Sequence, residues 1–105
     1  MAFDMFFIAD SSKTKEKINH SEEFIFHLLD GNNEYPEINL LWENFYNGPE
    51  IDSERSNRLV HELLKLKNEF SKHNQYKLIQ FIVDRLLIFF SIAYTKRVIV
   101  TCISD

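Results

Sequence analysis

The longest apolar stretch of the chain covers residues 78–94, and thirteen of its seventeen residues are apolar or aromatic. It holds no Gly or Pro, and its apolar residues recur at helical spacing. A helix that is apolar nearly all round is buried in a protein core or in a membrane. A membrane span needs about 20 consecutive apolar residues, and Asp84 and Arg85 interrupt this run. The pattern therefore predicts the central helix of a soluble domain, over residues 78–95.

Two shorter helices are predicted in the first half of the chain. Ser21 is expected to cap the first helix, and Gly31 to end it by taking the left-handed conformation. The buried side of this helix is expected to be Phe24, Ile25, Leu28 and Leu29. Pro36 suits the first position of the second helix, which Asn47, Gly48 and Pro49 would end. Its apolar residues follow the amphipathic spacing i, i+3, i+4 and i+7: Ile38, Leu41, Trp42 and Phe45.

A third helix is predicted to begin at a cap formed by Asp52 or Ser53 and to run to about Ser71. Its apolar stripe consists of Leu59, Leu63, Leu66 and Phe70. The outward positions are expected to be Arg58, Glu62, Lys65, Lys67 and Glu69, with an ion pair between Arg58 and Glu62 one turn apart.

The two ends of the chain carry strand patterns. Residues 2–9 alternate with Phe3, Met5 and Phe7 on one face, and the other face is also mostly apolar, so both faces are expected to be covered. Residues 96–103 are rich in β-branched side chains. Because a lone strand leaves its backbone groups unsatisfied, we expect the two termini to pair, in a direction that the sequence leaves open.

The elements together predict one α+β domain over residues 1–105. About four helices pack around the central apolar helix at 78–95, and the N- and C-terminal strands form a small β element. The polar stretch from Asp10 to His20, with Lys13, Lys15 and Lys17, is interpreted as an exposed connection.

The cysteine content is compatible with a reducing compartment. Two Gly and two Pro in 105 residues leave few tight turns for an all-β fold, and the single cysteine, Cys102, excludes an internal disulfide. The first ten residues lack the positive charge that begins a secretory signal. We therefore expect a cytoplasmic protein without a membrane partner.

Charge is spread unevenly along the chain, whose net charge is −4. Residues 1–54 sum to −9 and residues 55–105 to +5, and residues 20–54 hold nine acids with no Lys or Arg. Two interpretations are open. The halves attract each other within the folded monomer, or the acids form a docking face for a basic partner.

No catalytic or metal signature is present, so no enzyme activity, cofactor or metal is expected. The histidines (His20, His27, His61, His73) and Cys102 lack a recognised ligand spacing, and no Gly-rich elbow surrounds a serine. Asp84 shares the polar stripe of the central helix with Gln80 and Ser91, and is interpreted as a satisfied carboxylate.

Nucleic-acid binding is the alternative function, through a basic side over residues 55–77. It would use Arg55, Arg58, Lys65, Lys67, Lys72 and Lys77. The acidic balance of the whole chain opposes phosphate binding, so nucleic acid is the less favoured partner.

Part of the chain resembles small bacterial immunity proteins, which accompany contact-dependent growth inhibition and other polymorphic toxins. The resemblance lies in residues 35–38, 41–46, 48–52 and 59–63, and in the closing residues 102–105, over about the last two-thirds of the chain. It implies a cytosolic protein that binds and blocks a cognate toxin domain, commonly a nuclease. Immunity families bind through variable surfaces, so the resemblance assigns no binding residues.

The charge pattern adds a specific hypothesis. A nuclease needs a basic cleft for phosphates, and an acidic antitoxin surface is able to occupy it stoichiometrically. We expect this surface to comprise Glu34, Glu37, Glu43, Tyr46, Glu50 and Asp52. Tyr35 and Tyr46, which flank the second helix, are the candidate aromatic anchors.

Overall fold

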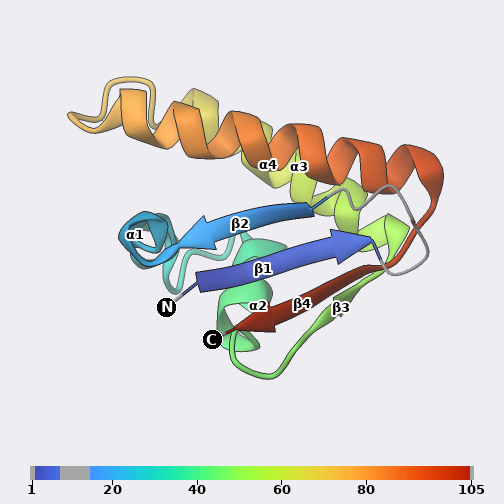
Figure 1. The fold of residues 1–105 in the computed structure, drawn as a ribbon. Coiled ribbons are helices and arrows are strands. Elements are labelled where there is room, and N and C mark those ends of the chain that lie inside the picture. Colours follow the sequence, from blue (N-terminus) through green and yellow to red (C-terminus); the bar gives the residue numbers. More distant parts are fainter. Residues whose placement is uncertain (1, 8–14, 105) are drawn as a thin grey trace.

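The structure is a computed structural model that describes residues 2–7 and 15–104. Its elements in chain order are β1 (Ala2–Phe7), β2 (Lys15–Asn19), a 3₁₀ turn (His20–Glu22), α1 (Phe24–Leu29), α2 (Pro36–Glu43), β3 (Glu50–Ile51), α3 (Ser53–Glu69), α4 (Tyr76–Lys96) and β4 (Val100–Ser104). The strands form one sheet, and α3 and α4 lie side by side as an antiparallel pair next to it (Figure 1). The predicted α+β class, with a long apolar helix, is confirmed.

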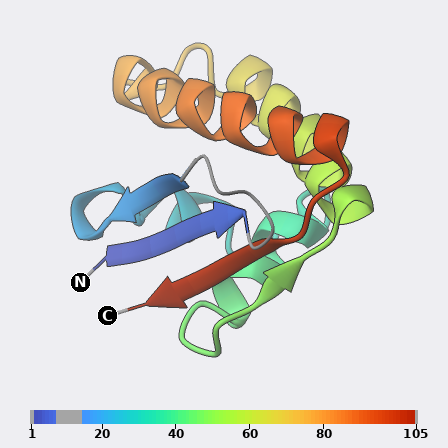
Figure 2. The same cartoon turned by 45° about the vertical axis from the view of Figure 1, so that its right-hand side comes forward.

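The sheet joins both ends of the chain. Its strand order is β2-β1-β4-β3, with every neighbouring pair antiparallel. Phe3 pairs with Ser104 and Phe7 with Val100, so the terminal strands lie together at the centre. The N- and C-termini consequently lie close together at one end of the sheet (Figure 2). The expected pairing of the termini is confirmed, and its direction is antiparallel.

Two strands were not predicted from the sequence. The expected exposed connection is wrong over Lys15–Asn19, which forms β2 and pairs with β1. Only Ile18 of this strand is buried, so the sequence shows no alternation of apolar and polar residues here. β2 is an edge strand, and its outward lysines protect that edge from pairing with other chains. β3 is only two residues long. The predictions for Ile8 and Lys13 lie outside the described residues.

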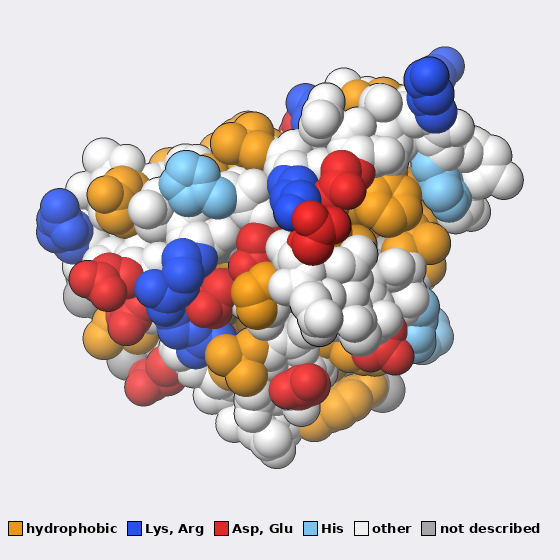
Figure 3. Space-filling model, turned by 180° about the vertical axis from the view of Figure 1, so that it is seen from behind, with side chains coloured by type: hydrophobic (Ala, Val, Ile, Leu, Met, Phe, Trp, Pro, Cys, Tyr) orange, Lys and Arg blue, Asp and Glu red, His pale blue; other side chains and the backbone are white. Residues whose placement is uncertain are grey.

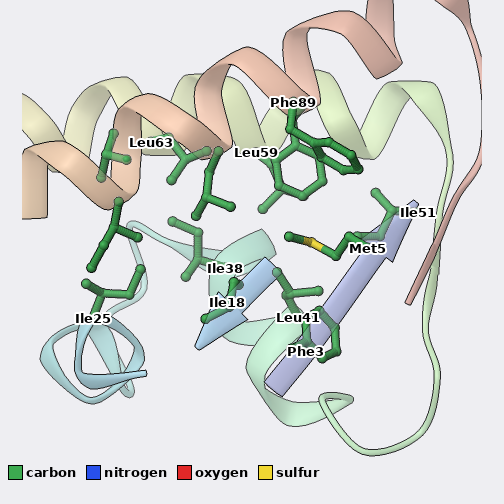
Figure 4. Packing of buried hydrophobic residues seen from close by; sticks show 14 of the residues in the cluster. Phe3, Met5, Ile18, Ile25, Ile38, Leu41, Ile51, Leu59, Leu63 and Phe89 are labelled. Atoms are coloured by element: carbon green, nitrogen blue, oxygen red, sulfur yellow. The ribbon is translucent and has the colours of Figure 1, made fainter. Parts of the chain in front are cut away.

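The core lies on one face of the sheet. Phe3, Met5 and Phe7 of β1 are buried there, and Phe7 contacts Phe89 of α4 with ring centroids 4.9 Å apart. Figure 4 shows side chains from β1, β2 and the helices pointing toward one another in this layer. The opposite face was also expected to be covered, but there Phe6 is half-buried and Ile103 is exposed.

The first helix begins differently from the prediction. Ser21 lies exposed inside the 3₁₀ turn, which begins at Asn19, whose N–H donates to the carboxylate of Glu22. α1 itself has Glu23 at its N-cap position, without a side-chain cap bond. Phe26 is buried, whereas Phe24 and Leu28 are only partly buried. The predicted stop at Gly31 is confirmed by its φ of 75°.

The later helices match their predicted starts. Pro36 is the first residue of α2, although this helix ends at Glu43, short of Asn47. Asp52 caps α3 by accepting the N–H of Arg55 at 2.8 Å. α4 buries seven residues against α3 and the sheet, namely Ile79, Ile82, Val83, Leu86, Phe89, Phe90 and Ala93. Its opposite side is exposed to solvent, so α4 is not enclosed all round.

Candidate functional site

The six side chains predicted to bind a partner lie along α2 and the loops at its two ends. Glu34 precedes α2 and Glu37 is in its first turn, whereas Glu43 is its last residue. Tyr46 follows in the turn to β3, which contains Glu50, and Asp52 is the cap of α3. The geometry divides them into carboxylates that contact α3 and groups that face solvent.

Glu37 belongs to the group that contacts α3. Its two carboxylate oxygens accept hydrogen bonds from Nε of Arg55 at 3.0 Å and from Nε of Arg58 at 2.9 Å. Only 13% of its side chain is exposed. Arg55 also donates to the backbone carbonyl of Glu50, so it fastens β3 to α2 through α3. The Glu37 charge is therefore neutralised within the molecule.

Glu62 is buried, and the prediction that it faces outward is wrong. Its carboxylate accepts the N–H groups of Glu37 and Ile38, each at 2.9 Å, so a residue of α3 caps the first turn of α2. Burial raises the pKa of Glu62 above its ordinary value, and the two backbone hydrogen bonds act in the opposite direction. Arg58 pairs with Glu37 in place of the expected partner Glu62.

A second link between α2 and α3 involves Glu34 and the buried Tyr35. Glu34 accepts a hydrogen bond from Nζ of Lys65 at 2.8 Å, and the Lys65 ammonium also lies 5.7 Å from the Tyr35 ring centroid. The prediction of Tyr35 as a partner-binding anchor is wrong, because its side chain is fully buried and its hydroxyl donates to Glu69. Burial is the main cause that raises the pKa of Tyr35, so this phenol stays protonated.

These contacts mix opposite charges on the helical side of the molecule. Viewed from behind the sheet, acidic and basic side chains lie next to each other in clusters on this face (Figure 3). Attraction between the two halves of the chain thus accounts for part of the acid-only segment. It accounts directly for Glu34 and Glu37.

Other acids keep their charge available to solvent. Asp30, Glu43, Glu50 and Glu54 are exposed, and within residues 2–7 and 15–104 their side chains have no hydrogen bond or ion pair. Asp30 and Glu43 lie on opposite walls of an open hollow of about 440 Å³. The hollow is formed by loop residues 30–33 and by Pro36, Glu37, Asn39, Leu40 and Glu43 of α2.

Asn39 holds the two walls of this hollow together. Its Nδ2 lies 3.0–3.1 Å from the backbone carbonyls of Leu29, Asn32 and Tyr35, so the 30–35 loop is tied to α2. Leu40 is exposed beside this tie. Asp30, Asn39 and Leu40 were missed by the sequence analysis. Asn39 and Leu40 lie one helical turn before Glu43 on α2, so their spacing was a usable signal, whereas only the folded loop brings Asp30 to this hollow.

Aromatic side chains continue the surface beyond the end of α2. Tyr46 is 59% exposed, and its ring packs edge-on against the buried Phe45 with centroids 5.2 Å apart. Trp42 is half-buried and stacks on Phe26 at 4.9 Å, so it serves mainly the core. An exposed aromatic ring and an exposed Leu40 therefore accompany the unpaired carboxylates.

The basic side predicted as the alternative surface is largely occupied. Arg55 and Arg58 bind Glu37, Lys65 binds Glu34, and Lys67 binds Asp84 at 2.8 Å. Of the six bases named for this side, Lys72 and Lys77 have no ion pair with the described residues. A nucleic acid would have to compete with carboxylates already in place.

Other reactive groups are held in structural roles. No set of three or more potential metal-binding side chains comes together among the residues that the structure describes. Burial raises the pKa of Cys102 to about 12, which disfavours the reactive thiolate. Asp84 has its ion pair with Lys67 on the surface of the α3–α4 pair.

α4 is long enough and apolar enough to cross a membrane by length and composition alone, a test that the core helix of a soluble protein also passes. Comparisons with protein families, with curated proteins and with solved structures found no match to this chain.

Proposed function

We propose that this chain is a cytoplasmic immunity protein that binds a basic toxin domain, of the nuclease type, and blocks it stoichiometrically. The proposed contact surface, here called the α2 surface, comprises Asp30, Leu40, Glu43, Tyr46 and Glu50. Three of these residues belong to the surface expected from the sequence, and Asp30 and Leu40 extend it along the hollow beside α2.

One observation carries the proposal. The carboxylates of Asp30, Glu43 and Glu50 have no partner within the described chain, whereas Glu34 and Glu37 nearby each have an ion pair with α3. A basic partner supplies the missing cations and is steered to this side by charge. Leu40 and Tyr46 offer apolar area that contact with the partner would desolvate.

Glu34, Glu37 and Asp52 have a supporting role in this proposal. Their contacts with α3 fix the position of α2 and of the turn that leads to β3. They act as positioning residues, and partner binding falls on the residues of the α2 surface. A stable surface lowers the entropy cost of association.

The test first identifies the genes beside the one that encodes this chain. If a neighbour encodes a large secreted protein, its C-terminal domain is the probe. Titration calorimetry and stopped-flow mixing measure affinity and association rate at low and high salt. We expect the double variant Glu43→Gln/Glu50→Gln to associate at least about tenfold more slowly at low salt, because charge steering is lost. High salt should reduce this difference.

The matched control is Ser91→Lys/Thr95→Lys, which changes net charge by the same amount at exposed positions of α4. It should associate with the probe like the wild type. Equal rates for the wild type and the glutamine variant at low salt would rule out the α2 surface. Tight, salt-sensitive retention of mixed RNA and DNA on filters, without binding to the probe domain, would favour the nucleic-acid alternative.

A further inference from the structure

α4 exposes a row of large apolar side chains on the side that faces away from the core. Leu78 is 43% exposed, Phe81 59% and Ile88 64%. Phe81 and Ile88 are seven residues apart, two helical turns, and Leu78 is one turn before Phe81, so they follow one side of the helix. Leu64 of α3 is also exposed. Apolar rows of this kind mark contact surfaces more often than isolated exposed residues do.

The row lies at the outer edge of the molecule. α4 forms the layer farthest from the β3 edge of the sheet and runs lengthwise beside β2 (Figures 1 and 2). Arg85 joins these two elements by donating to the backbone carbonyl of Lys17 at 3.3 Å and to Glu22 at 2.8 Å. The row is therefore presented on a helix anchored at its middle.

Basic side chains lie at both ends of the row, whereas Glu16 and Glu22 lie near its middle, where they pair with Arg85 beside the Phe81 ring. Lys77 is next to Leu78, and Lys72 lies in the turn before α4. Lys96 and Arg97 are exposed at the other end of the helix. Asp84 is the only acid in α4, and Lys67 neutralises it. The unpaired acids of the α2 surface belong to other elements.

We propose that the exposed face of α4 docks on an anionic lipid surface. A helix with an apolar row and cations at both ends matches the bilayer interface, where acyl chains lie beneath negative headgroups. The helix would lie along the surface, because the seven buried residues on its inner side pack in the core of the protein. This proposal uses different residues from the α2 surface and does not depend on a toxin partner.

Both parts of the surface are needed for this mode of binding. The apolar row alone is short, since Leu78 and Ile88 are about 15 Å apart along the helix axis. The cations alone would hold the protein only at low salt. Binding should therefore depend on anionic lipid and on the apolar side chains together.

The experiment is co-sedimentation of the full chain with vesicles. One set contains phosphatidylcholine with phosphatidylglycerol, and the other contains phosphatidylcholine alone. We expect at least about tenfold stronger binding to the anionic set, reduced by salt. Phe81→Ser/Ile88→Ser should lose at least about tenfold of this binding. Lys72→Glu/Lys77→Glu should lose it as well, and tests the proposal even if the serine variant fails to fold.

The control variants remove exposed apolar groups elsewhere. Tyr46→Ser alters a ring with the same exposed fraction as Phe81, 59%, and Ile103→Ser alters an isoleucine that is 52% exposed on the far face of the sheet. Both should bind vesicles like the wild type. Tyr46→Ser should still weaken toxin binding, so failure of either proposal is recognised separately.

Three outcomes would overturn the lipid proposal. The first is equal binding of the wild type to both vesicle sets, or to neither. The second is unchanged binding by a folded Phe81→Ser/Ile88→Ser variant, which would leave a purely electrostatic attraction. The third is a dimer in sedimentation velocity that the serine variant converts to a monomer, because a second copy would then be the occupant.

Discussion

The carboxylate of Glu62, in the middle of α3, accepts the N–H of Ile38 at 2.9 Å and thereby caps a different helix, α2. The N–H of Glu37 donates to the other carboxylate oxygen at the same distance. N-terminal amides of a helix are commonly capped by the residue just before it, and here Tyr35 makes no side-chain cap bond. The start of α2 therefore depends on tertiary packing against α3.

Removal of this cap should destabilise the whole fold. We expect Glu62→Ala to lower the free energy of unfolding by about 1–3 kcal/mol, because the buried amide of Ile38 and the partly buried amide of Glu37 lose their acceptor. Urea denaturation followed by circular dichroism measures the change. Glu43→Ala is the control, since Glu43 is exposed at the end of α2 and should change stability by less than about 0.5 kcal/mol. Equal losses from the two variants would contradict the role of Glu62.

The burial of Glu62 also predicts a pH dependence with a definite sign. Burial, the largest cause, raises its pKa above the ordinary 4.5, so the folded protein binds this proton more tightly than the unfolded chain does. The stability contributed by protonation is full below the ordinary value and is lost as pH rises through the raised pKa. The stability of the wild type relative to Glu62→Gln should accordingly fall with rising pH across that window.

Urea titrations of both proteins at several pH values measure this difference. Comparing the wild type with the glutamine variant largely cancels the contributions of other acids. A relative stability that instead grows with pH would mean that the two amide hydrogen bonds outweigh burial for Glu62.

Long helices with regular apolar spacing were predictable from the sequence. α3 and α4 each provide many turns of pattern, and local caps such as Asp52 act on their own backbone. The short edge strands were missed because β3 has two residues and β2 only one fully buried side chain. Pairing of the termini was predictable because each end has a strand pattern and a lone strand would leave its backbone N–H and C=O groups without hydrogen bonds.

The candidate site was predictable only in part, because side-chain pairing is a long-range property. Charge counting marked Glu37 as available, but Arg55 and Arg58 reach it from 18 and 21 residues away. Glu62 did leave a signal, since it lies three residues after Leu59 and just before Leu63, on the buried side of α3. An acid at such a position indicates a buried acceptor.

The pairing of Glu37 with Arg58 should be measurable but modest. Arg58 is largely exposed, so a double-mutant cycle with Glu37→Gln and Arg58→Gln should give a coupling of about 0.3–1 kcal/mol that decreases with salt. The same cycle with Glu37→Gln and Arg85→Gln is the control, because Arg85 pairs with Glu16 and Glu22. A coupling as large in the control as in the test would contradict a direct pair.

The end of α4 carries backbone strain that substitution can relieve. Arg97 has a left-handed conformation, with φ of 54° and ψ of 47°, at a position where glycine is common. Its guanidinium also lies 5.7 Å from the Tyr94 ring centroid. Arg97→Gly and Arg97→Ala both remove that contact, and only glycine removes the strain.

The glycine variant should therefore be more stable than the alanine variant by about 1 kcal/mol. Thermal and urea unfolding of the pair measure this difference, and the same pair at Ser91, an exposed position in the interior of α4, is the control. There alanine should be the more stable variant by about 1 kcal/mol, because glycine weakens a helix interior. Equal stability of the two Arg97 variants would show that residue 97 leaves the left-handed conformation.

Cys102 should be nearly inert while the protein is folded. Its side chain is buried on β4, and burial raises its pKa from 9.0 to about 12, although the positive charge of Arg55 acts in the opposite direction. The difference of three pKa units corresponds to about a thousandfold less thiolate near pH 8. Alkylation by iodoacetamide, followed by mass spectrometry, should therefore be at least about a thousandfold slower in the native protein than in urea.

A Glu62→Ala variant, destabilised at a residue of α3, should react faster than the wild type in the absence of urea, since reaction proceeds through the unfolded population. A native rate close to the unfolded rate would place Cys102 at the surface and contradict the burial of β4.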